Sequence, residues 1–290
     1  MTMKTLQIGT IINTEWEVPA FRHLELRPKQ ARYCLVIPVI NEGERLINQL
    51  QCMAELGHMD IVDVIIADGG SNDASTRPDR LLELGVVELL IKDGPGKLSA
   101  QLRMAYAWAL EAGYDGIITI DGNGKDGVET IPDFVAALDH GIDYAQASRF
   151  IKGGEAINTP FVRLMAIRFL HAPLLSLAAG KWLTDTTQGY RAYSARYLLH
   201  LDVRPFRSVF AKYELLAYLT VRASQLGLNA TEIPTRRIYP DDGTVPTKIS
   251  TISGNLDLLN TLWSTVTRRY HPKNRGANSP FNNIRPSDER

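Results

Sequence analysis

The fold and a candidate site can both be inferred from one stretch, Ile117-Ile118-Thr119-Ile120-Asp121-Gly122-Asn123-Gly124-Lys125-Asp126. Its first four residues are apolar or β-branched and do not alternate with polar ones, which is typical of a strand buried on both faces of a parallel sheet. The strand ends at a carboxylate and a glycine-rich turn. Because ligands bind beyond the carboxyl ends of strands in open α/β sheets, Asp121 is predicted to lie where the chemistry takes place.

The turn after this strand offers ligands for a metal ion. Asp121 and Asn123 can direct two hard oxygens at one divalent cation. Lys125 and Asp126 place a positive and a negative group within reach. Asp, Asn and Gly also occur in turns for purely conformational reasons, so the turn alone leaves both interpretations open.

The chain before this stretch alternates strands and helices. Continuous apolar strands are predicted at 33–39, 63–67 and 86–91, and helices at 46–56, 76–84 and 98–112. This rhythm predicts an α/β fold of βαβ units, with a parallel sheet and right-handed crossovers. The first two strands also end in acidic turns, at Asn41-Glu42 and at 68–73.

The chain after Asp126 continues the pattern less regularly. The predicted elements are helices at 131–138, 161–179, 211–226 and 249–270, strands at 144–147, 190–193 and 229–238, and a flexible turn at 239–246. Residues 1–30 are expected to form an irregular extension or an edge strand. Residues 31–270 then make up one domain, and 271–290 a flexible tail.

Composition excludes several classes of protein. Lys and Arg together number 32, as do Asp and Glu, so the net charge is zero and no global basic field favours nucleic acid. Cys34 and Cys52 are predicted to be reduced residues of the core. No signal peptide and no uncharged apolar run of membrane-spanning length are recognised. The protein is therefore expected in the cytoplasm, or peripherally on the inner face of the membrane.

A phosphate-binding loop of the nucleotide-triphosphatase type is rejected at Gly94-Pro95-Gly96-Lys97. The first glycine of that motif and the hydroxyl residue after its lysine are both missing. The turn nevertheless follows a predicted strand, so Gly96 and Lys97 are retained as candidate nucleotide-binding residues.

Taken together, the motifs resemble the GT-A glycosyltransferases of family 2. The resemblance is carried by Ile37-Pro38-Val39-Ile40-Asn41-Glu42, by Asp68-Gly69-Gly70-Ser71-Asn72-Asp73 and by Asp121-Gly122-Asn123. Ser148-Arg149-Phe150 before Gly153-Gly154, and Asp185-Thr186-Thr187-Gln188-Gly189-Tyr190-Arg191, look like the dolichol-phosphate mannose synthase branch. The resemblance spans roughly residues 33–250 and implies a doubly wound, mainly parallel GT-A sheet with helices on both faces.

The resemblance also implies roles for residues of the first turns. Pro38, Ile40, Glu42 and Asp68 correspond to positions that hold the nucleoside, although Ile40 stands where an aromatic residue is often found. Asp121 and Asn123 correspond to the pair that holds Mg²⁺ or Mn²⁺ on the donor diphosphate. Asn123 replaces the second aspartate of that pair, so weaker metal binding or partial substitution by Lys125 is left open.

Basic residues further along correspond to positions that face phosphate groups. The resemblance implies this role for Arg149, Arg163, Arg168 and Lys248. A solvated helix face is the alternative for Arg163 and Arg168, and an exposed surface position is an equal alternative for Lys248. Asp185 is the candidate general base, and with Asp121 and Arg149 it forms the candidate catalytic set. A turn or cap role is the alternative for Asp185.

The implied reaction is a metal-assisted, inverting transfer of a sugar from a nucleotide-diphosphate sugar to a polyprenyl phosphate. A phosphate acceptor needs no strong general base, and none stands out in the sequence. A sugar hydroxyl of a polysaccharide or glycolipid is the alternative acceptor, and a non-catalytic nucleotide-sugar-binding module is the alternative function. The helix at 161–179 or the one at 249–270 is expected to contact the membrane. No nucleic-acid partner is expected, and a homodimer is left open.

Overall fold

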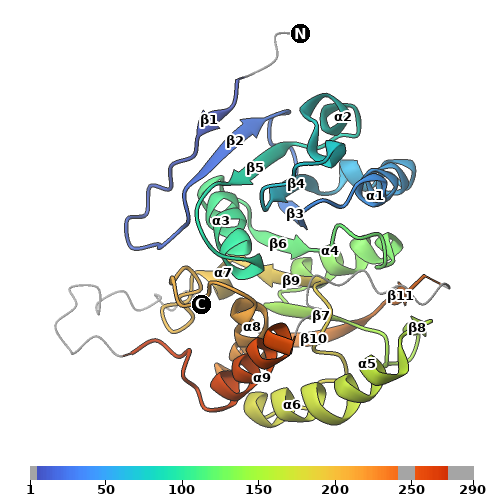
Figure 1. Ribbon diagram of the computed structural model, residues 1–290, viewed down its shortest axis with the longest axis vertical. Coiled ribbons are helices and arrows are strands. Elements are labelled where there is room, and N and C mark those ends of the chain that lie inside the picture. The colour runs from blue at the N-terminus through green and yellow to red at the C-terminus, as the bar shows by residue number, and fades with distance from the viewer. Residues whose placement is uncertain (1–4, 241–251, 274–290) are drawn as a thin grey trace, which may run out of the picture.

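A nine-stranded mixed sheet forms the centre of the protein in a computed structural model that describes residues 5–240 and 252–273 (Figure 1). In spatial order its strands are β1 (Gln7–Ile8), β2 (Phe21–Glu25), β5 (Glu88–Lys92), β4 (Asp63–Asp68), β3 (Tyr33–Val39), β6 (Gly116–Thr119), β9 (Arg191–Ser194), β7 (Tyr144–Ser148) and β10 (Ala230–Pro234).

The parallel part of the sheet is as predicted. β3 pairs in parallel with both β4 and β6, and β4 pairs in parallel with β5. The registers place Val39 opposite Asp68 and Val36 opposite Thr119, so these strands end close together. The acidic turns that follow them therefore meet at one edge of the sheet.

The sheet is less uniformly parallel than the strand–helix rhythm suggests. β9 lies antiparallel between β6 and β7, because the chain returns to the sheet only after a long excursion through residues 149–190. At the opposite edge β2 pairs antiparallel with β5, and β1 with β2. The edge-strand alternative for residues 1–30 is therefore confirmed.

Helices cover both faces of the sheet, as expected for this fold class. One face carries α3 (Leu98–Glu111), α7 (Ala195–Leu198) and α8 (Glu214–Gln225) over one hydrophobic core. The other carries α1 (Glu44–Glu55), α2 (Pro78–Glu83) and α4 (Ile131–Asp139) over a second. Short 3₁₀ helices are formed by η1 (His58–Asp60), η2 (Ala74–Thr76) and η3 (Val128–Thr130).

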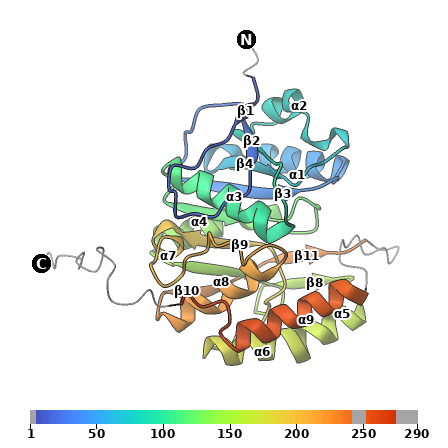
Figure 2. The same cartoon turned by 60° about the vertical axis from the view of Figure 1, so that its left-hand side comes forward.

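A third layer lies outside α8. The helix predicted at 161–179 consists of α5 (Phe161–Ala166), a π-helical turn (η4, Ile167–His171) and α6 (Ala172–Ala179). α6 contacts α8 and α9 (Ile252–Val266), and these helices lie together at the lower end of both views (Figures 1 and 2). A small core that includes Leu175, Val221 and Leu262 joins them.

The strand predicted at 229–238 is in fact two strands in two sheets. β10 pairs with β7 in the main sheet, whereas β11 (Arg236–Ile238) pairs with β8 (Glu155–Ile157). The change occurs at Thr235, whose amide donates to the carbonyl of Ser148. β11 thereby reaches the turn after β6, where Arg237 forms a backbone bridge with Asp126.

Candidate active site

A cavity of about 420 Å³ opens at the carboxyl ends of β3, β4, β5 and β6. The sequence-predicted residues that line it are Pro38, Ile40, Glu42, Gly96, Lys97, Asp121, Asn123, Lys125 and Arg163. The fold thus brings together four turns and a distant helix that the sequence analysis had assigned separately to nucleotide, metal and phosphate binding.

The first two turns are held together by side-chain hydrogen bonds. The Asn41 amide donates to Ser71 Oγ over 3.0 Å, and the Asn72 amide donates to Asn41 Oδ1 over 2.8 Å. Asn41 has a left-handed backbone, with φ of 52°, a conformation that asparagine tolerates better than most residues. These bonds fix the wall that Pro38, Ile40 and Glu42 present to the cavity.

Asp68 supports this wall from behind. Its Oδ1 accepts hydrogen bonds from the amides of Gly70 and Ser71, and its Oδ2 accepts one from Thr76 Oγ1. The carboxylate is buried and does not line the cavity, whereas the next residue, Gly69, does. In this structure Asp68 therefore shapes the second turn and does not open onto the nucleotide space.

Asp121 lies at the boundary between the cavity and the chain behind it. A Cβ atom on Gly189 would lie 2.2 Å from Asp121 Oδ1, so a glycine is needed there to let the carboxylate pass. Oδ2 accepts a hydrogen bond from Arg237 Nη2 over 3.1 Å. The Asp121 side chain remains 26% exposed and is open to a ligand from the cavity side.

Three cationic groups gather around the ring of Tyr239. Lys125 Nζ lies 5.1 Å from the ring centroid, and the guanidinium carbons of Arg163 and Arg237 lie 5.7 and 5.8 Å from it. The aromatic face stabilises cations at such distances. All three side chains line the cavity, which therefore has a positively charged side suited to phosphate oxygens.

Burial shifts the pKa values of two groups in and beside this cluster, Lys125 and Asp126. Burial, reinforced by Arg237, lowers the pKa of Lys125 to about 8, against the opposing effect of Asp121. Asp126 receives two hydrogen bonds from Arg237 Nη1, at 2.5 and 2.6 Å. Burial raises the pKa of Asp126 to about 6, although the Arg237 guanidinium acts in the opposite direction.

Arg149 and Asp185 form a buried ion pair that the cavity does not reach. Arg149 Nε and Nη2 donate to the two Asp185 oxygens over 2.7 and 2.9 Å, and both side chains are almost fully buried. Asp185 also accepts hydrogen bonds from Thr187 and Gln188. Neither residue contacts the cavity in this structure, so the geometry provides neither Asp185 as a general base nor Arg149 as a phosphate ligand.

Arg168, another predicted phosphate ligand, does not line the cavity either. The guanidinium of Arg168 lies 4.8 Å from the ring centroid of Phe150, on the exposed side of the π-helical turn. Lys248 lies outside the described residues.

The structure adds residues that the sequence analysis missed. Val39, Gly69, Lys92, Leu98, Gln101, Gly122, Tyr213 and Arg237 also line the cavity. Gln101 Nε2 donates to the carbonyls of Val39 and Ala67 and so ties β3 to β4. Arg237 and Tyr239 were hidden inside a predicted strand and turn. Their only signal in the sequence was the consecutive pair Arg236-Arg237 next to a Pro/Gly-rich segment.

The donor set suits a cation that arrives with a phosphorylated ligand. Asp121 supplies one carboxylate, and Asn123 Oδ1 accepts a weak hydrogen bond from its own turn, from the Lys125 amide, over 3.2 Å. Among the described residues, no cluster of three or more His, Cys, Asp or Glu side chains could hold a metal. One or two protein oxygens, completed by substrate phosphates and water, is an arrangement that Mg²⁺ accepts.

Two curated relatives match most of the chain. An undecaprenyl-phosphate mannosyltransferase of Micrococcus luteus is 30% identical over 206 residues, which are 70% of this chain and 82% of the relative. A polyprenol monophosphomannose synthase of Mycolicibacterium smegmatis is 28% identical over 216 residues, which are 72% of this chain and 78% of the relative. No protein-family model matches the chain.

Solved structures agree on the fold. Glucosyl-3-phosphoglycerate synthase of Mycobacterium tuberculosis, in complex with Mn²⁺, UDP-glucose and phosphoglyceric acid, has a TM-score of 0.58 at 16% identity, covering 81% of this chain and 79% of that one. Mannosyl-3-phosphoglycerate synthase of Rubrobacter xylanophilus also gives 0.58, at 11% identity, covering 82% and 73%. At these identities the likeness shows that the fold is shared.

Proposed function

The chain belongs to the polyprenyl-phosphate glycosyltransferase branch of the GT-A glycosyltransferases, and we propose that it transfers a hexose from a nucleotide-diphosphate sugar to a polyprenyl phosphate. One observation carries the proposal. The cavity joins the nucleotide-side turns, the Asp121 turn and Arg163, which comes from the apolar helix 161–179. Mannose is the sugar that the names of both relatives suggest.

In the proposed arrangement, the cavity holds the diphosphate of the donor next to the phosphate of the acceptor. Pro38, Ile40 and Glu42 flank the nucleoside of the donor. Lys125 and Arg237 face its diphosphate, and Arg163 faces the acceptor phosphate. An oxygen of the acceptor phosphate attacks the anomeric carbon as the bond to the nucleoside diphosphate breaks, which inverts the configuration. Lys125 and Arg237 stabilise the negative charge that develops on the departing diphosphate.

A divalent cation fits this arrangement. Asp121 and Asn123 would hold Mg²⁺ or Mn²⁺ together with the donor, and the cation would supply further charge neutralisation for the diphosphate. Arg237 pairs with Asp121 but remains anchored by Asp126, so it stays beside the site when the carboxylate changes partners. Metal binding by Asp121 is therefore compatible with the presence of Arg237 beside the site.

The acceptor assignment rests on the acids that line the cavity. Among the lining residues that the structure describes, Glu42 and Asp121 are the carboxylates and none is a histidine. Glu42 accepts a salt bridge from Arg45 over 2.9 Å, and Asp121 accepts one from Arg237. A sugar hydroxyl would need a free base here, whereas a phosphate is already anionic near neutral pH. The lining therefore favours the phosphate acceptor.

The apolar helix supports the delivery of a lipid substrate from a membrane surface. By length and composition Phe161–Ala179 is the one helix of the described residues that would suffice to cross a bilayer, and 22% of its most apolar window is buried. Its α6 part packs on α8 and α9, and Arg163 and Arg168 interrupt its apolar surface. We therefore propose that it lies on the membrane with Phe161, Val162, Phe169 and Leu177 facing lipid.

The proposal is tested first by ligand binding. Thermal melting with UDP, GDP, CDP or dTDP, each with and without Mn²⁺, should give a stabilisation of about 1–3 kcal/mol for one nucleotide. Asp121→Asn should remove the metal-dependent part of that shift and lower sugar transfer to polyprenyl phosphate by about 100-fold or more.

A matched variant and a second acceptor make this test decisive. Asp115→Asn removes an exposed carboxylate that pairs with Arg32 at the surface, and it should leave the nucleotide shift unchanged. Sugar transferred to a glycan hydroxyl but not to polyprenyl phosphate would overturn the acceptor assignment. Absence of a shift with every nucleotide would overturn the donor assignment as well.

A further inference from the structure

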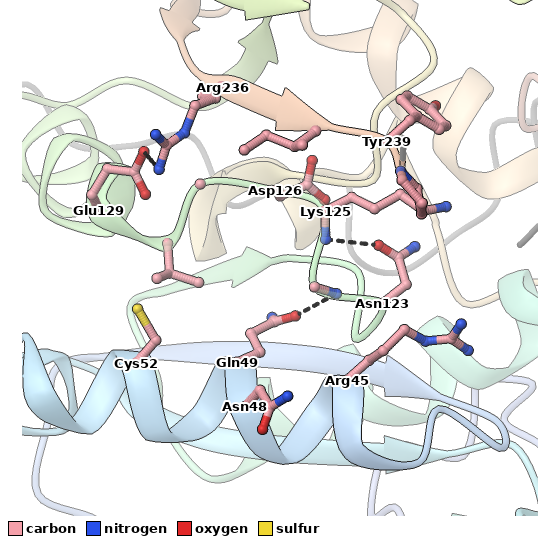
Figure 3. A pocket seen from close by; sticks show the side chains of 15 residues that line it. Arg45, Asn48, Gln49, Cys52, Asn123, Lys125, Asp126, Glu129, Arg236 and Tyr239 are labelled. Atoms are coloured by element: carbon pink, nitrogen blue, oxygen red, sulfur yellow. Dashed lines mark hydrogen bonds and ion pairs between the residues drawn. The ribbon is translucent and has the colours of Figure 1, made fainter. Parts of the chain in front are cut away.

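A second, larger cavity lies on the other side of the Asn123–Lys125 turn. Its volume is about 610 Å³, and it opens between α1 and the chain from β11 to Pro240 (Figure 3). Among the described residues, its lining shares Asn123 and Lys125 with the first cavity, in which we place the sugar donor and which we call the donor cavity. It is therefore a separate space, and the two cavities have the metal-binding turn as a common wall.

Three cationic and two anionic side chains line this second cavity. Arg45 comes from α1, Lys125 from the shared turn and Arg236 from β11. Asp126 and Glu129 also line it, and their carboxylates pair with Arg237 and Arg236. The cations of the described lining therefore outnumber its carboxylates by one.

The two guanidinium groups are held by pairs that an anion can replace. Arg45 pairs with Glu42 over 2.9 Å, and Arg236 pairs with Glu129 over 3.1 Å. The Arg236 and Glu129 side chains are 46% and 44% exposed, and ion pairs so open to water contribute little to stability. A phosphate group offers a guanidinium stronger, bidentate hydrogen bonds.

The rest of the lining suits an organic molecule that carries the phosphate. Asn48 has no side-chain hydrogen bond to any described residue, and Gln49 Nε2 is buried without a partner. Val128, Ile238 and Pro240 supply an apolar surface beside these amides. The volume is in the range of small-molecule sites.

We propose that this cavity binds a phosphorylated small molecule that regulates donor binding. Coupling follows from the shared wall, because Gln49 Oε1 accepts a hydrogen bond from the Gly124 amide over 3.0 Å and the Lys125 ammonium lines both cavities. One ammonium cannot serve phosphates on both sides equally well. Occupancy of the second cavity therefore lowers donor affinity, and the donor lowers the affinity of the regulator by the same factor.

Cys52 provides a direct test of occupancy. It is exposed and lines the second cavity, whereas Cys34, the other cysteine of the sequence, is buried. The rate of Cys52 alkylation by N-ethylmaleimide, which is uncharged, is measured by mass spectrometry on the native protein at constant ionic strength. Inorganic pyrophosphate should slow the reaction at least threefold and saturably. A nucleoside monophosphate that protects at lower concentration would indicate that the apolar surface is also used.

Matched variants distinguish the two cavities. Arg45→Gln together with Arg236→Gln should remove the protection, whereas Lys97→Gln, at a cation that lines only the donor cavity, should retain it. Because both arginines are about half exposed, the double variant should fold, which its melting curve verifies. No protection in the unmodified protein, protection that persists in the double variant, or protection lost in Lys97→Gln would each overturn the proposal.

Discussion

The charges of individual side chains explain how this site tolerates Asn123. Lys125, Arg163 and Arg237 line the donor cavity together with the carboxylate of Asp121, and the buried Asp126 pairs with Arg237 outside that cavity. With an aspartate at position 123, the three positive charges and the three carboxylates of this cluster would sum to zero. With asparagine the cluster retains one net positive charge, which an incoming diphosphate can neutralise without depending wholly on a metal ion.

Two arginines on the same apolar helix should differ sharply in function. Arg163 lines the donor cavity, whereas Arg168 stacks on Phe150 outside it. Arg163→Gln is therefore expected to lower kcat/KM for polyprenyl phosphate by about 10- to 100-fold, because a charge-assisted contact to phosphate is worth roughly 1.5–3 kcal/mol. Steady-state transfer assays with the acceptor varied at saturating donor provide the measurement.

Arg168→Gln is the matched control for that experiment. It removes the same charge from the same helix, and the expected change in kcat/KM is less than about threefold, since an exposed cation–π contact is worth only about 0.5–1 kcal/mol. Equal losses in the two variants would mean that the helix acts through its overall charge, and the assignment of Arg163 to the acceptor phosphate would fail.

At the scale of elements, the helix from α5 to α6 combines two tasks. Its first turn places Arg163 in the cavity, and its outer surface exposes Phe169 and Leu177, which are 74% and 76% exposed. Trp182 just beyond it and Trp263 on α9 are also exposed, at 67% and 60%. Aromatic residues of this kind are common at membrane interfaces. The apolar surface thus begins at the cavity that a lipid phosphate must enter.

Membrane contact through this helix is tested by Phe169→Asp combined with Leu177→Asp. Burying each apolar side chain in lipid contributes roughly 1.5–3 kcal/mol, so the double variant should bind liposomes at least about tenfold more weakly in a flotation assay. Transfer to a short, water-soluble polyprenyl phosphate should be preserved.

Leu201→Asp serves as the control for the membrane experiment. Leu201 is 69% exposed but lies in the turn after α7, away from the helix in sequence. This variant should float with liposomes as the unmodified protein does. If it detaches as strongly as the double variant, the helix is not the surface that contacts lipid.

At the scale of the whole molecule, hydrophobic patterns and turn motifs in the sequence predicted the parallel strands and the turns that follow them. The continuous apolar runs of β3, β4 and β6 predicted the parallel part of the sheet, and the end of β3 and the turns after β3 and β6 supply six of the predicted residues that line the donor cavity. The direction of β9 was not accessible, because pairing partners far apart in the chain set it. Cys52 was wrongly placed in the core because it lies next to apolar positions of an amphipathic helix, whereas the fold turns it toward the second cavity.

Long-range packing also sets contacts of the site residues that the sequence did not show. Arg149 and Asp185 have the residue types of a catalytic pair, but they are 36 positions apart and neutralise each other within the protein. Arg237 reaches Asp121 across 116 positions only because β10 and β11 belong to different sheets. No local pattern encodes either contact.

The junction of the C-terminal segment with α8 makes the stability of the whole protein depend on pH. His271 Nδ1 lies 3.4 Å from Arg222 Nη1, and its ring meets Tyr218 edge-on. Burial, reinforced by Arg222, Arg268 and Arg207, lowers the pKa of His271 to about 4. Unfolding restores an ordinary value near 6.5, so the unfolded chain binds more protons between these values.

His271 should therefore contribute stability that is fully present above about pH 6.5 and is lost as the pH falls toward 4. Urea unfolding at pH 7.5, 5.5 and 4.5 is expected to show a smaller decline for His271→Gln than for the unmodified protein, since glutamine cannot take up the proton. His140→Gln, at an exposed histidine on the opposite face, should follow the unmodified curve. Parallel curves for His271→Gln and the unmodified protein would show that the pKa of this imidazole is the same in the folded and unfolded states, and the lowering attributed to its burial would be wrong.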